Sequence, residues 1–530
     1  MTSRAGVSLL LAALLVACGG SWGGAHAAEH TGGPPLLPTR VRRLSNFEYE
    51  RSASELVATP LHIADQLPPE VRQAGYTRNA DQVVSAEHLA RLDVIAHSVA
   101  KDAVNTRLSI LAPCASTPDA ACTTRVVETL GRRAFRRPLS AAERGTLLTV
   151  FAAGAADGAG FVGGLELLLR VLLISPSFMY TTELGAGGAP GAVVTLDPYE
   201  IASELSYTVR SGPPDEALLI AAQSGALLSA SERERQARRL IAESDTRYQF
   251  RRFVLEWLEV DALAQTAKSS SVLPDYDDLK GHMLDETEAF VDEVMVHHGG
   301  SVQSLLSAGF ASVDPAMARF YGLHGYGPEA SLAGSGRLGI LQQASFLSAH
   351  SHEDSSSPVK RGDFVLRRLL CETVKRPGEV GVNIVFPPLA ITRTTRERFA
   401  LHTAVPECAG CHSNIDPIGF SFEEFDAAGR RRSSENGQRV DTTADFWRSG
   451  KEQRFADSRA LSLALAADPQ VSACFARQAF RYFSAGASPE AERAFMAIEQ
   501  EAPQGQAGSL IEELLTFVKS ELFVKREVMP

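Results

Sequence analysis

Two cysteines and a histidine late in the chain have the spacing of a covalent cofactor-attachment site. Cys408, Cys411 and His412 form a C-x-x-C-H motif. Thiols three positions apart on a helical turn can each add to one vinyl group of a haem, and the adjacent histidine can then bind the iron. The motif therefore predicts covalent haem c, with Cys408 and Cys411 as thioether residues and His412 as the proximal iron ligand. We expect the carbonyl of Pro417, or of a neighbour, to accept a hydrogen bond from the other ring nitrogen of His412.

A C-x-x-C pair also occurs in zinc sites, redox dithiols and structural disulfides. A zinc site would need two more ligands at matching spacing, and neither a second C-x-x-C nor an H-x-x-x-H follows the motif. A redox dithiol normally follows a strand in a thioredoxin-like unit, a pattern that this sequence lacks. A structural disulfide between Cys408 and Cys411 stays open, and it would make the chain a non-haem binding or scaffold lipoprotein of the cell envelope.

The sixth iron ligand would decide between electron transfer and catalysis. A second strong ligand closes the iron to substrates, whereas an open position allows haem-dependent oxidation. His352 and His402 are the candidate distal ligands, ahead of Met496. Catalytic residues cannot be named from the sequence, and an enzyme of this kind would be a haem-dependent oxidoreductase.

Two adjacent cations precede the motif. Lys360 and Arg361 could pair with the anionic propionates of a haem, because a guanidinium binds carboxylates in a bidentate manner. Solvated charges near a helix start are the alternative interpretation.

The N-terminus predicts export and a lipid anchor. An apolar run over 7–17 is too short to span a bilayer and has the length of a signal-peptide core. Cys18 follows directly, as in a bacterial lipobox, so we expect it to be acylated and to bind membrane lipid. The expected location is the cell envelope, facing the periplasm or the cell surface, with the outer membrane slightly favoured. The A-x-A site at Ala25–Ala27 leaves simple secretion as the alternative.

Four further cysteines suit an oxidising compartment. Cys114 and Cys122 flank a short Ser/Thr/Pro/Ala-rich segment and are expected to form a local disulfide, with two free thiols as the alternative. Cys371 and Cys474 remain and could link the segment before the motif to the C-terminal helices. Sequence alone cannot fix that connectivity.

Composition bounds the partners. The 530 residues carry a net charge of -11, which repels phosphate backbones, so no nucleic-acid partner is expected. A redox partner is expected, but its identity is unknown. No serine-hydrolase elbow, phosphate-binding glycine loop or dinucleotide fingerprint occurs, which disfavours hydrolase, kinase and nicotinamide-linked functions.

The apolar periodicity predicts an all-α or nearly all-α protein. Ser140 begins a capping box, and Asp197 and Ser488 are each an N-cap followed by proline. A multi-domain helical body with a C-terminal cytochrome-c-like helical domain is expected. The predicted units are a signal peptide at 1–18, a flexible tether at 19–38, an N-terminal helical domain at 39–185, a central helical domain at 186–330, a Ser/Pro loop and helix segment at 331–385 and a haem domain at 386–530.

Short blocks of sequence along the mature chain resemble a known family. The blocks lie at 42–49, 132–140, 174–180, 204–207, 343–347, 351–362, 396–399, 408–412 and 416–420. In this order they resemble the Planctomycete-type and myxobacterial-type secreted cytochrome-associated proteins, built from several domains of unknown function and ending in a cytochrome-c-like domain. The resemblance implies a haem cofactor and a location in the cell envelope, but no particular reaction.

Overall fold

Helices dominate the chain, as the sequence predicted. The computed structural model describes residues 35–243, 247–374, 392–404, 406–448, 451–501 and 508–529, so the predicted signal segment and Cys18 lie outside the described residues. The N-terminal helices are α2 (Asn46–Leu56), α3 (Ala86–Thr106), α4 (Leu108–Leu111), α5 (Ala120–Phe135), α6 (Ala141–Ala155), α7 (Gly160–Leu173) and α8 (Pro176–Met179). The capping box predicted at Ser140 is confirmed, and Ser45 begins α2 in the same way.

The middle of the chain is also helical. Its helices are α9 (Pro198–Arg210), α10 (Glu216–Gln223), α11 (Ala230–Ile241), α12 (Arg247–Trp257), α13 (Tyr276–His297), α14 (Val302–Ser307), α15 (Pro315–Tyr321) and α16 (Ala344–Ala349). Asp197 caps α9 through its side chain, with Pro198 in the first turn, as predicted.

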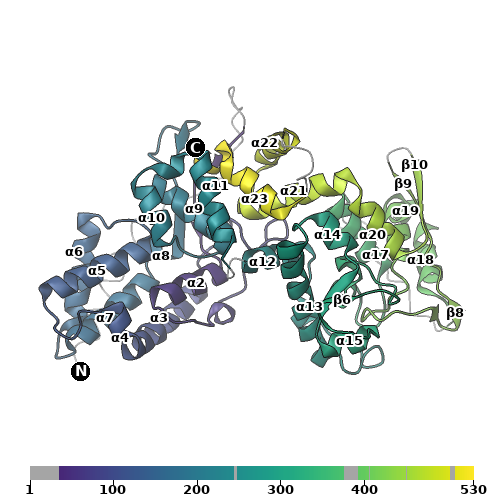
Figure 1. Cartoon of the computed structure of the whole chain (residues 1–530), viewed down its shortest axis with the longest axis horizontal. Helices are drawn as coiled ribbons and strands as arrows, with labels where there is room; N and C mark the ends of the chain where they lie inside the picture. Colours follow the sequence, from purple (N-terminus) through teal and green to yellow (C-terminus); the bar gives the residue numbers. More distant parts are fainter. Residues whose placement is uncertain are drawn as a thin grey trace.

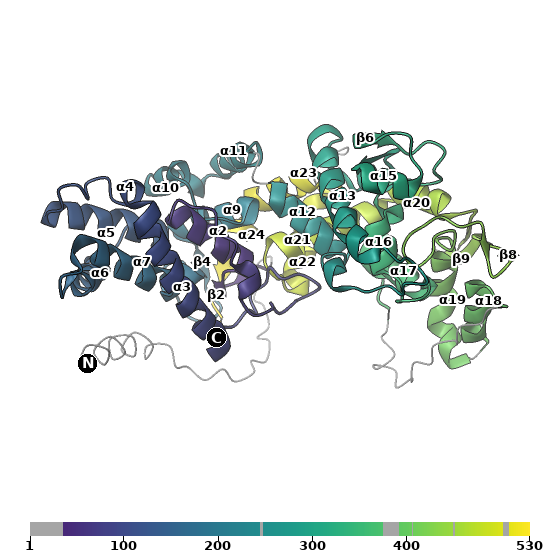
Figure 2. The same ribbon diagram turned by 90° about the horizontal axis from the view of Figure 1, so that it is seen from below.

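The last third carries the C-x-x-C-H motif and then returns to the N-terminal part. Its helices are α17 (Pro358–Phe364), α18 (Thr395–Thr403), α19 (Pro406–Phe420), α20 (Ser458–Ala466), α21 (Pro469–Phe483), α22 (Pro489–Gln500), α23 (Leu510–Lys519) and α24 (Glu521–Val524). A π-helical turn, Val365–Leu369, extends α17. The cap predicted at Ser488 is confirmed at the start of α22. Figures 1 and 2 place α17, α18 and α19 at the end of the molecule opposite α5 and α6.

Short strands, which the sequence analysis did not predict, close the fold. β11 (Lys525–Glu527) pairs in parallel with β1 (Leu37–Pro38) and antiparallel with β4 (Val193–Thr195). The remaining antiparallel pairs are β2 (Arg40–Arg43) with β3 (Tyr180–Glu183), β5 (Phe310–Val313) with β6 (Gly327–Ser331), β7 (Ser434–Glu435) with β8 (Gln438–Arg439) and β9 (Ala444–Arg448) with β10 (Lys451–Phe455). In Figure 1 the C-terminal segment, drawn in yellow, runs back from the motif end and passes beside α11.

The largest hydrophobic core is built from residues far apart in sequence. It contains Leu37, Phe253, Phe364, Phe475 and Phe523, all fully buried. Residues on both sides of the boundaries expected at 186, 331 and 386 contribute to it. A second core fills the N-terminal helices, and a smaller third one lies between α13, β5 and α15. Among the described helices, none combines the length and the apolar character needed to cross a membrane.

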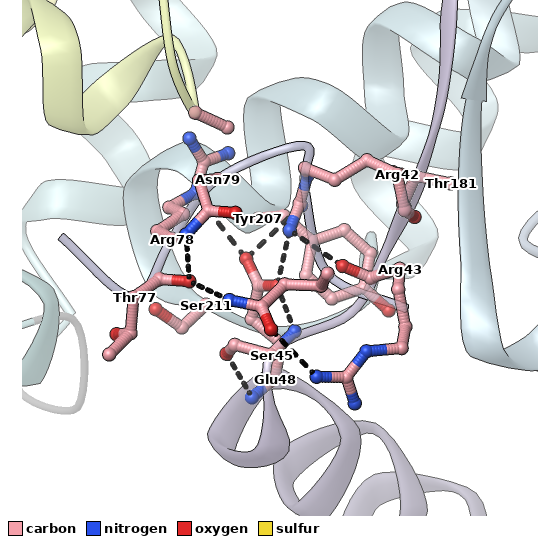
Figure 3. Close-up of polar contacts among 12 residues, drawn as sticks. Arg42, Arg43, Ser45, Glu48, Thr77, Arg78, Asn79, Thr181, Tyr207 and Ser211 are labelled. Carbon is pink, nitrogen blue, oxygen red and sulfur yellow. Dashed lines mark hydrogen bonds and ion pairs between the residues drawn. The ribbon is translucent and has the colours of Figure 1, made fainter. Parts of the chain in front are cut away.

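A buried ion-pair network fastens α2 to the rest of the molecule (Figure 3). Glu48 of α2 accepts hydrogen bonds from Arg42 at 2.6 and 3.2 Å and lies 3.4 Å from Arg78. Arg78 also contacts Glu204 of α9 and donates to the carbonyl of Tyr482 in α21. Burial by itself would raise the pKa of Glu48, but Arg42 and Arg78 hold it below its ordinary value. The network thus joins three helices through groups withdrawn from water.

Two disulfides join the pairs considered from the sequence. Cys114 is bonded to Cys122, eight residues away, and Cys371 to Cys474, 103 residues away. The second disulfide links the end of the α17 segment to α21. The chain that it encloses includes α18 and α19, so this bridge limits how far the motif segment can move from the body.

Candidate functional site

The C-x-x-C-H motif lies on the first turns of α19. Cys408 and Cys411 are partly exposed free thiols, whereas the other four cysteines of the described chain form disulfides. At 100° per residue, Cys408, Cys411 and His412 fall within one face of the helix. The motif therefore presents two thiols and an imidazole from the same side, which fits covalent attachment of a haem.

His412 is oriented by a buried carboxylate. Its Nδ1 lies 2.8 Å from Oδ1 of Asp416, one helical turn further along α19. The Asp416 side chain is 1% exposed, while that of His412 is 21% exposed. An ionised carboxylate can only accept, so Nδ1 donates and Nε2 is the ring nitrogen suited to bind a metal.

This contact corrects the partner expected for His412. The sequence predicts a hydrogen bond to the carbonyl of Pro417 or of a neighbour, but the acceptor is the side chain of Asp416. Pro417 lies inside α19. The i, i+4 spacing of His412 and Asp416 was visible in the sequence and is the signal that could have identified the pair.

The motif helix is seated directly against α17. A Cβ atom at Gly362 of α17 would lie 2.0 Å from the carbonyl oxygen of Ile415, and one at Gly419 would lie 1.9 Å from that of Pro358. The two backbones therefore touch where side chains normally keep helices 8 to 10 Å apart. Ile415 and Gly419 flank Asp416 in the sequence, so the stretch of backbone that carries the carboxylate takes part in this close contact.

Helix α18 lies beside α19 (Figure 2). The guanidinium of Arg396 lies over the ring of Phe420, 4.4 Å from its centroid, and donates to the carbonyl of Asp441 at 3.1 Å. His402, a candidate distal ligand, belongs to α18, and its side chain lies outside the described residues.

The other candidate ligand, His352, lies in the loop that leads into α17. Its backbone is held on both sides, because its N–H donates to Ser355 and its carbonyl accepts from Lys268. Burial and the charge of Lys360 lower the pKa of His352 below its ordinary value. Ser356 of the same loop donates to Glu423, just beyond α19, so this loop borders the motif segment.

Met496 does not lie near the motif. It belongs to α22, and both views place α22 beside α21 and α23, away from α19. The helix packing thus separates this methionine from His412.

Arg361 is unsuited to bind a propionate, which corrects that expectation. Its side chain is fully buried, and it donates to the carbonyls of Leu347, Phe422, Phe425 and Asp426 at 3.0 to 3.1 Å. It therefore fastens the segment after α19 to the segment before α17. Lys360 is exposed and donates to the carbonyl of Ser351 at 2.8 Å.

One further group could hold a metal ion. Single ligand atoms of Glu293, His298 and Glu329 lie within 4.8 Å of one another. The 2.6 Å contact between His298 Nε2 and Glu329 already accounts for two of the three, and both are exposed. This group is remote in sequence from the motif and carries no assignment.

Four family models match successive parts of the chain, each described as a protein of unknown function. They are PSD3 (DUF1587) at 42–105, PSD5 (DUF1595) at 122–183, PSD4 (DUF1592) at 196–323 and PSCyt3 (DUF1588) at 337–435. The expected succession of domains of unknown function is thereby confirmed. The PSCyt3 match covers α17, α18 and α19, and its name refers to a cytochrome-type domain. No curated protein and no solved structure matches the chain.

Proposed function

We propose that this protein is an exported c-type cytochrome-like protein with one haem, which transfers electrons in the cell envelope. The observation that carries the proposal concerns the side chains of α19. Its two cysteines are free thiols, whereas the other described cysteines form disulfides, and the adjacent His412 is oriented by a hydrogen bond from Nδ1. The PSCyt3 match over the same segment supports it.

Each motif residue has a defined role in this proposal. Cys408 and Cys411 form thioether bonds, and His412 binds iron through Nε2. Bound haem supplies a one-electron redox centre. Asp416 accepts a hydrogen bond from Nδ1–H and fixes the ring orientation.

The sixth ligand sets the kind of redox function. His402 or His352 would close the iron and make the protein an electron carrier, whereas an open position would allow haem-dependent oxidation. Removing the true ligand converts a low-spin spectrum into a high-spin one. His402→Ala and His352→Ala, measured side by side, therefore assign it, and two unchanged spectra would exclude both.

The proposed cellular location follows from the N-terminal sequence. Acylation of Cys18 would anchor the chain in membrane lipid, and the two disulfides are consistent with an oxidising compartment. The redox partner would then be another envelope protein. Wild type and Cys18→Ser should fractionate differently, with only wild type in the membrane fraction. A soluble wild type would favour cleavage at Ala25–Ala27.

An optical spectrum tests the haem assignment. Wild type, produced with c-type haem maturation genes, should show a reduced α-band that survives denaturation, and Cys408→Ala/Cys411→Ala should not. Cys114→Ala/Cys122→Ala is the matched control, because it removes two cysteines far from the motif and should keep the band. A folded, colourless wild type would overturn the cytochrome proposal and leave the envelope scaffold.

A further inference from the structure

The group that accepts a hydrogen bond from the proximal histidine is a carboxylate. A neutral backbone carbonyl would be sufficient to orient the ring. Asp416 accepts from His412 Nδ1 at 2.8 Å, and its own side chain is almost wholly buried. Its second oxygen, Oδ2, has no hydrogen-bond partner among the described residues. Within the described chain, no lysine or arginine is paired with this carboxylate, and its contact with the imidazole is the hydrogen bond from Nδ1.

The surroundings keep this pair together. Asp416 lies between Ile415 and Gly419, the two residues of α19 that touch the backbone of α17. Asp416 and His412 lie one helical turn apart on α19, so the helix sets their spacing. The contact with α17 fixes the turn of backbone that carries the carboxylate.

A buried, otherwise unneutralised carboxylate acts on the ring that it binds. It draws the Nδ1 proton and increases electron density on Nε2, which raises the basicity of the ligand. A more basic ligand stabilises ferric over ferrous iron and lowers the reduction potential. The burial of Asp416 strengthens this effect because water does not screen the charge.

We infer that Asp416 is a positioning residue that tunes the redox centre, holding it at low potential by giving His412 partial imidazolate character. This inference rests on the proposed function, since it requires haem iron on His412. A low reduction potential means that the haem favours the ferric state. The inferred role of the protein is therefore that of a low-potential electron donor.

Asp416→Asn separates charge from geometry in the haem-loaded protein. The amide oxygen can still accept from Nδ1, but the negative charge is lost. We expect the ferric-to-ferrous preference to fall at least tenfold, a positive shift of about 59 mV for one electron. Haem content should stay at the wild-type level, and the iron–histidine bond should weaken in vibrational spectra.

Asp363→Asn is the matched control. Asp363 lies on α17 and pairs with Arg367, so this change removes one nearby charge without touching His412. It should alter the preference less than twofold. Equal shifts in the two variants would show a general charge effect and overturn the role of Asp416.

Wild type alone still tests the hydrogen bond on which the inference depends if Asp416→Asn does not fold. In the ferrous, 15N-histidine-labelled holoprotein, the proton on the iron-bound ring should sit on Nδ1 and exchange slowly with water. A rapidly exchanging proton would overturn the inference. Absence of covalent haem from wild type would overturn the proposed function itself, a result distinct from loaded haem with an unshifted potential.

Discussion

Gly419 of α19 and Pro358 of α17 meet backbone to backbone. A Cβ atom on Gly419 would lie 1.9 Å from the Pro358 carbonyl oxygen, far inside van der Waals contact. The reciprocal contact of Gly362 with Ile415 lies on the same helix pair. The position of the C-x-x-C-H motif therefore depends on two residues that lack side chains.

A methyl group at this contact should separate the two helices. We expect Gly419→Ala to destabilise the protein by roughly 2 to 3 kcal/mol, because neither backbone can yield without breaking helical hydrogen bonds. Urea unfolding followed by circular dichroism measures the change. Gly410→Ala is the control on the same helix. No atom lies within 4 Å of its Cβ position, so helix propensity should stabilise it by up to about 1 kcal/mol. Equal stability of the two variants would contradict the close contact.

The buried network around α2 predicts an unequal response of two glutamates. Glu48→Gln leaves Arg42 and Arg78 without their shared anion and should cost about 3 to 5 kcal/mol in free energy of unfolding. Glu55, on the same helix, is partly exposed and pairs with Arg210. Glu55→Gln should cost about 1 kcal/mol or less. Chemical denaturation of both variants gives the comparison, and a small loss in Glu48→Gln would mean that water reaches the network.

The two disulfides should differ in their contribution to stability. Chain-entropy arguments favour the longer loop, so Cys371→Ala/Cys474→Ala should lose roughly 2 kcal/mol more than Cys114→Ala/Cys122→Ala. Unfolding midpoints under oxidising conditions measure this difference. The larger loss should be accompanied by faster proteolysis between 371 and 474, because that loop contains α18 and α19. An equal loss in both variants would show that loop length is not the controlling factor.

A buried acid on α13 predicts a pH dependence. Burial raises the pKa of Glu286 to about 8, while Tyr321 donates to it at 2.6 Å. Between its ordinary value of 4.5 and about 8, the folded state holds a proton that the unfolded state has released. This group therefore makes stability fall as pH rises, by up to about 1.4 kcal/mol per pH unit.

Glu286→Gln removes that titration. Its free energy of unfolding should decline less than that of wild type between pH 5 and 8, as measured by urea midpoints across this range. Glu288→Gln changes a partly exposed glutamate of the same helix, paired with Arg251, and should retain the wild-type slope. Parallel curves for wild type and Glu286→Gln would refute the assignment.

Features that depend on neighbours in the sequence were accessible without the structure. The caps at Ser140, Asp197 and Ser488 follow from the local competition for free N–H groups at a helix start. The helical class follows from apolar spacing, and the C-x-x-C-H motif carries its chemistry within five residues. The four family models found along the chain agree with the order of blocks seen in the sequence.

Features that depend on distant partners were not accessible. The pairing of β11 with β1 joins residues almost 490 positions apart, and strands of two or three residues have no periodicity to detect. The sequence suggested that Arg361 is a surface cation. Its guanidinium instead donates hydrogen bonds to backbone carbonyls of two segments inside the protein.

The sequence by itself determined which atoms are available for chemistry: two thiols, an imidazole and, one turn later, an acid. Only the tertiary structure decided that Asp416 rather than Pro417 meets His412, because that choice depends on burial of the carboxylate and on the way α17 holds α19. The spacing of residues along the sequence specifies which side chains make up the site. The electrostatics of the site arise from packing between segments far apart in the chain.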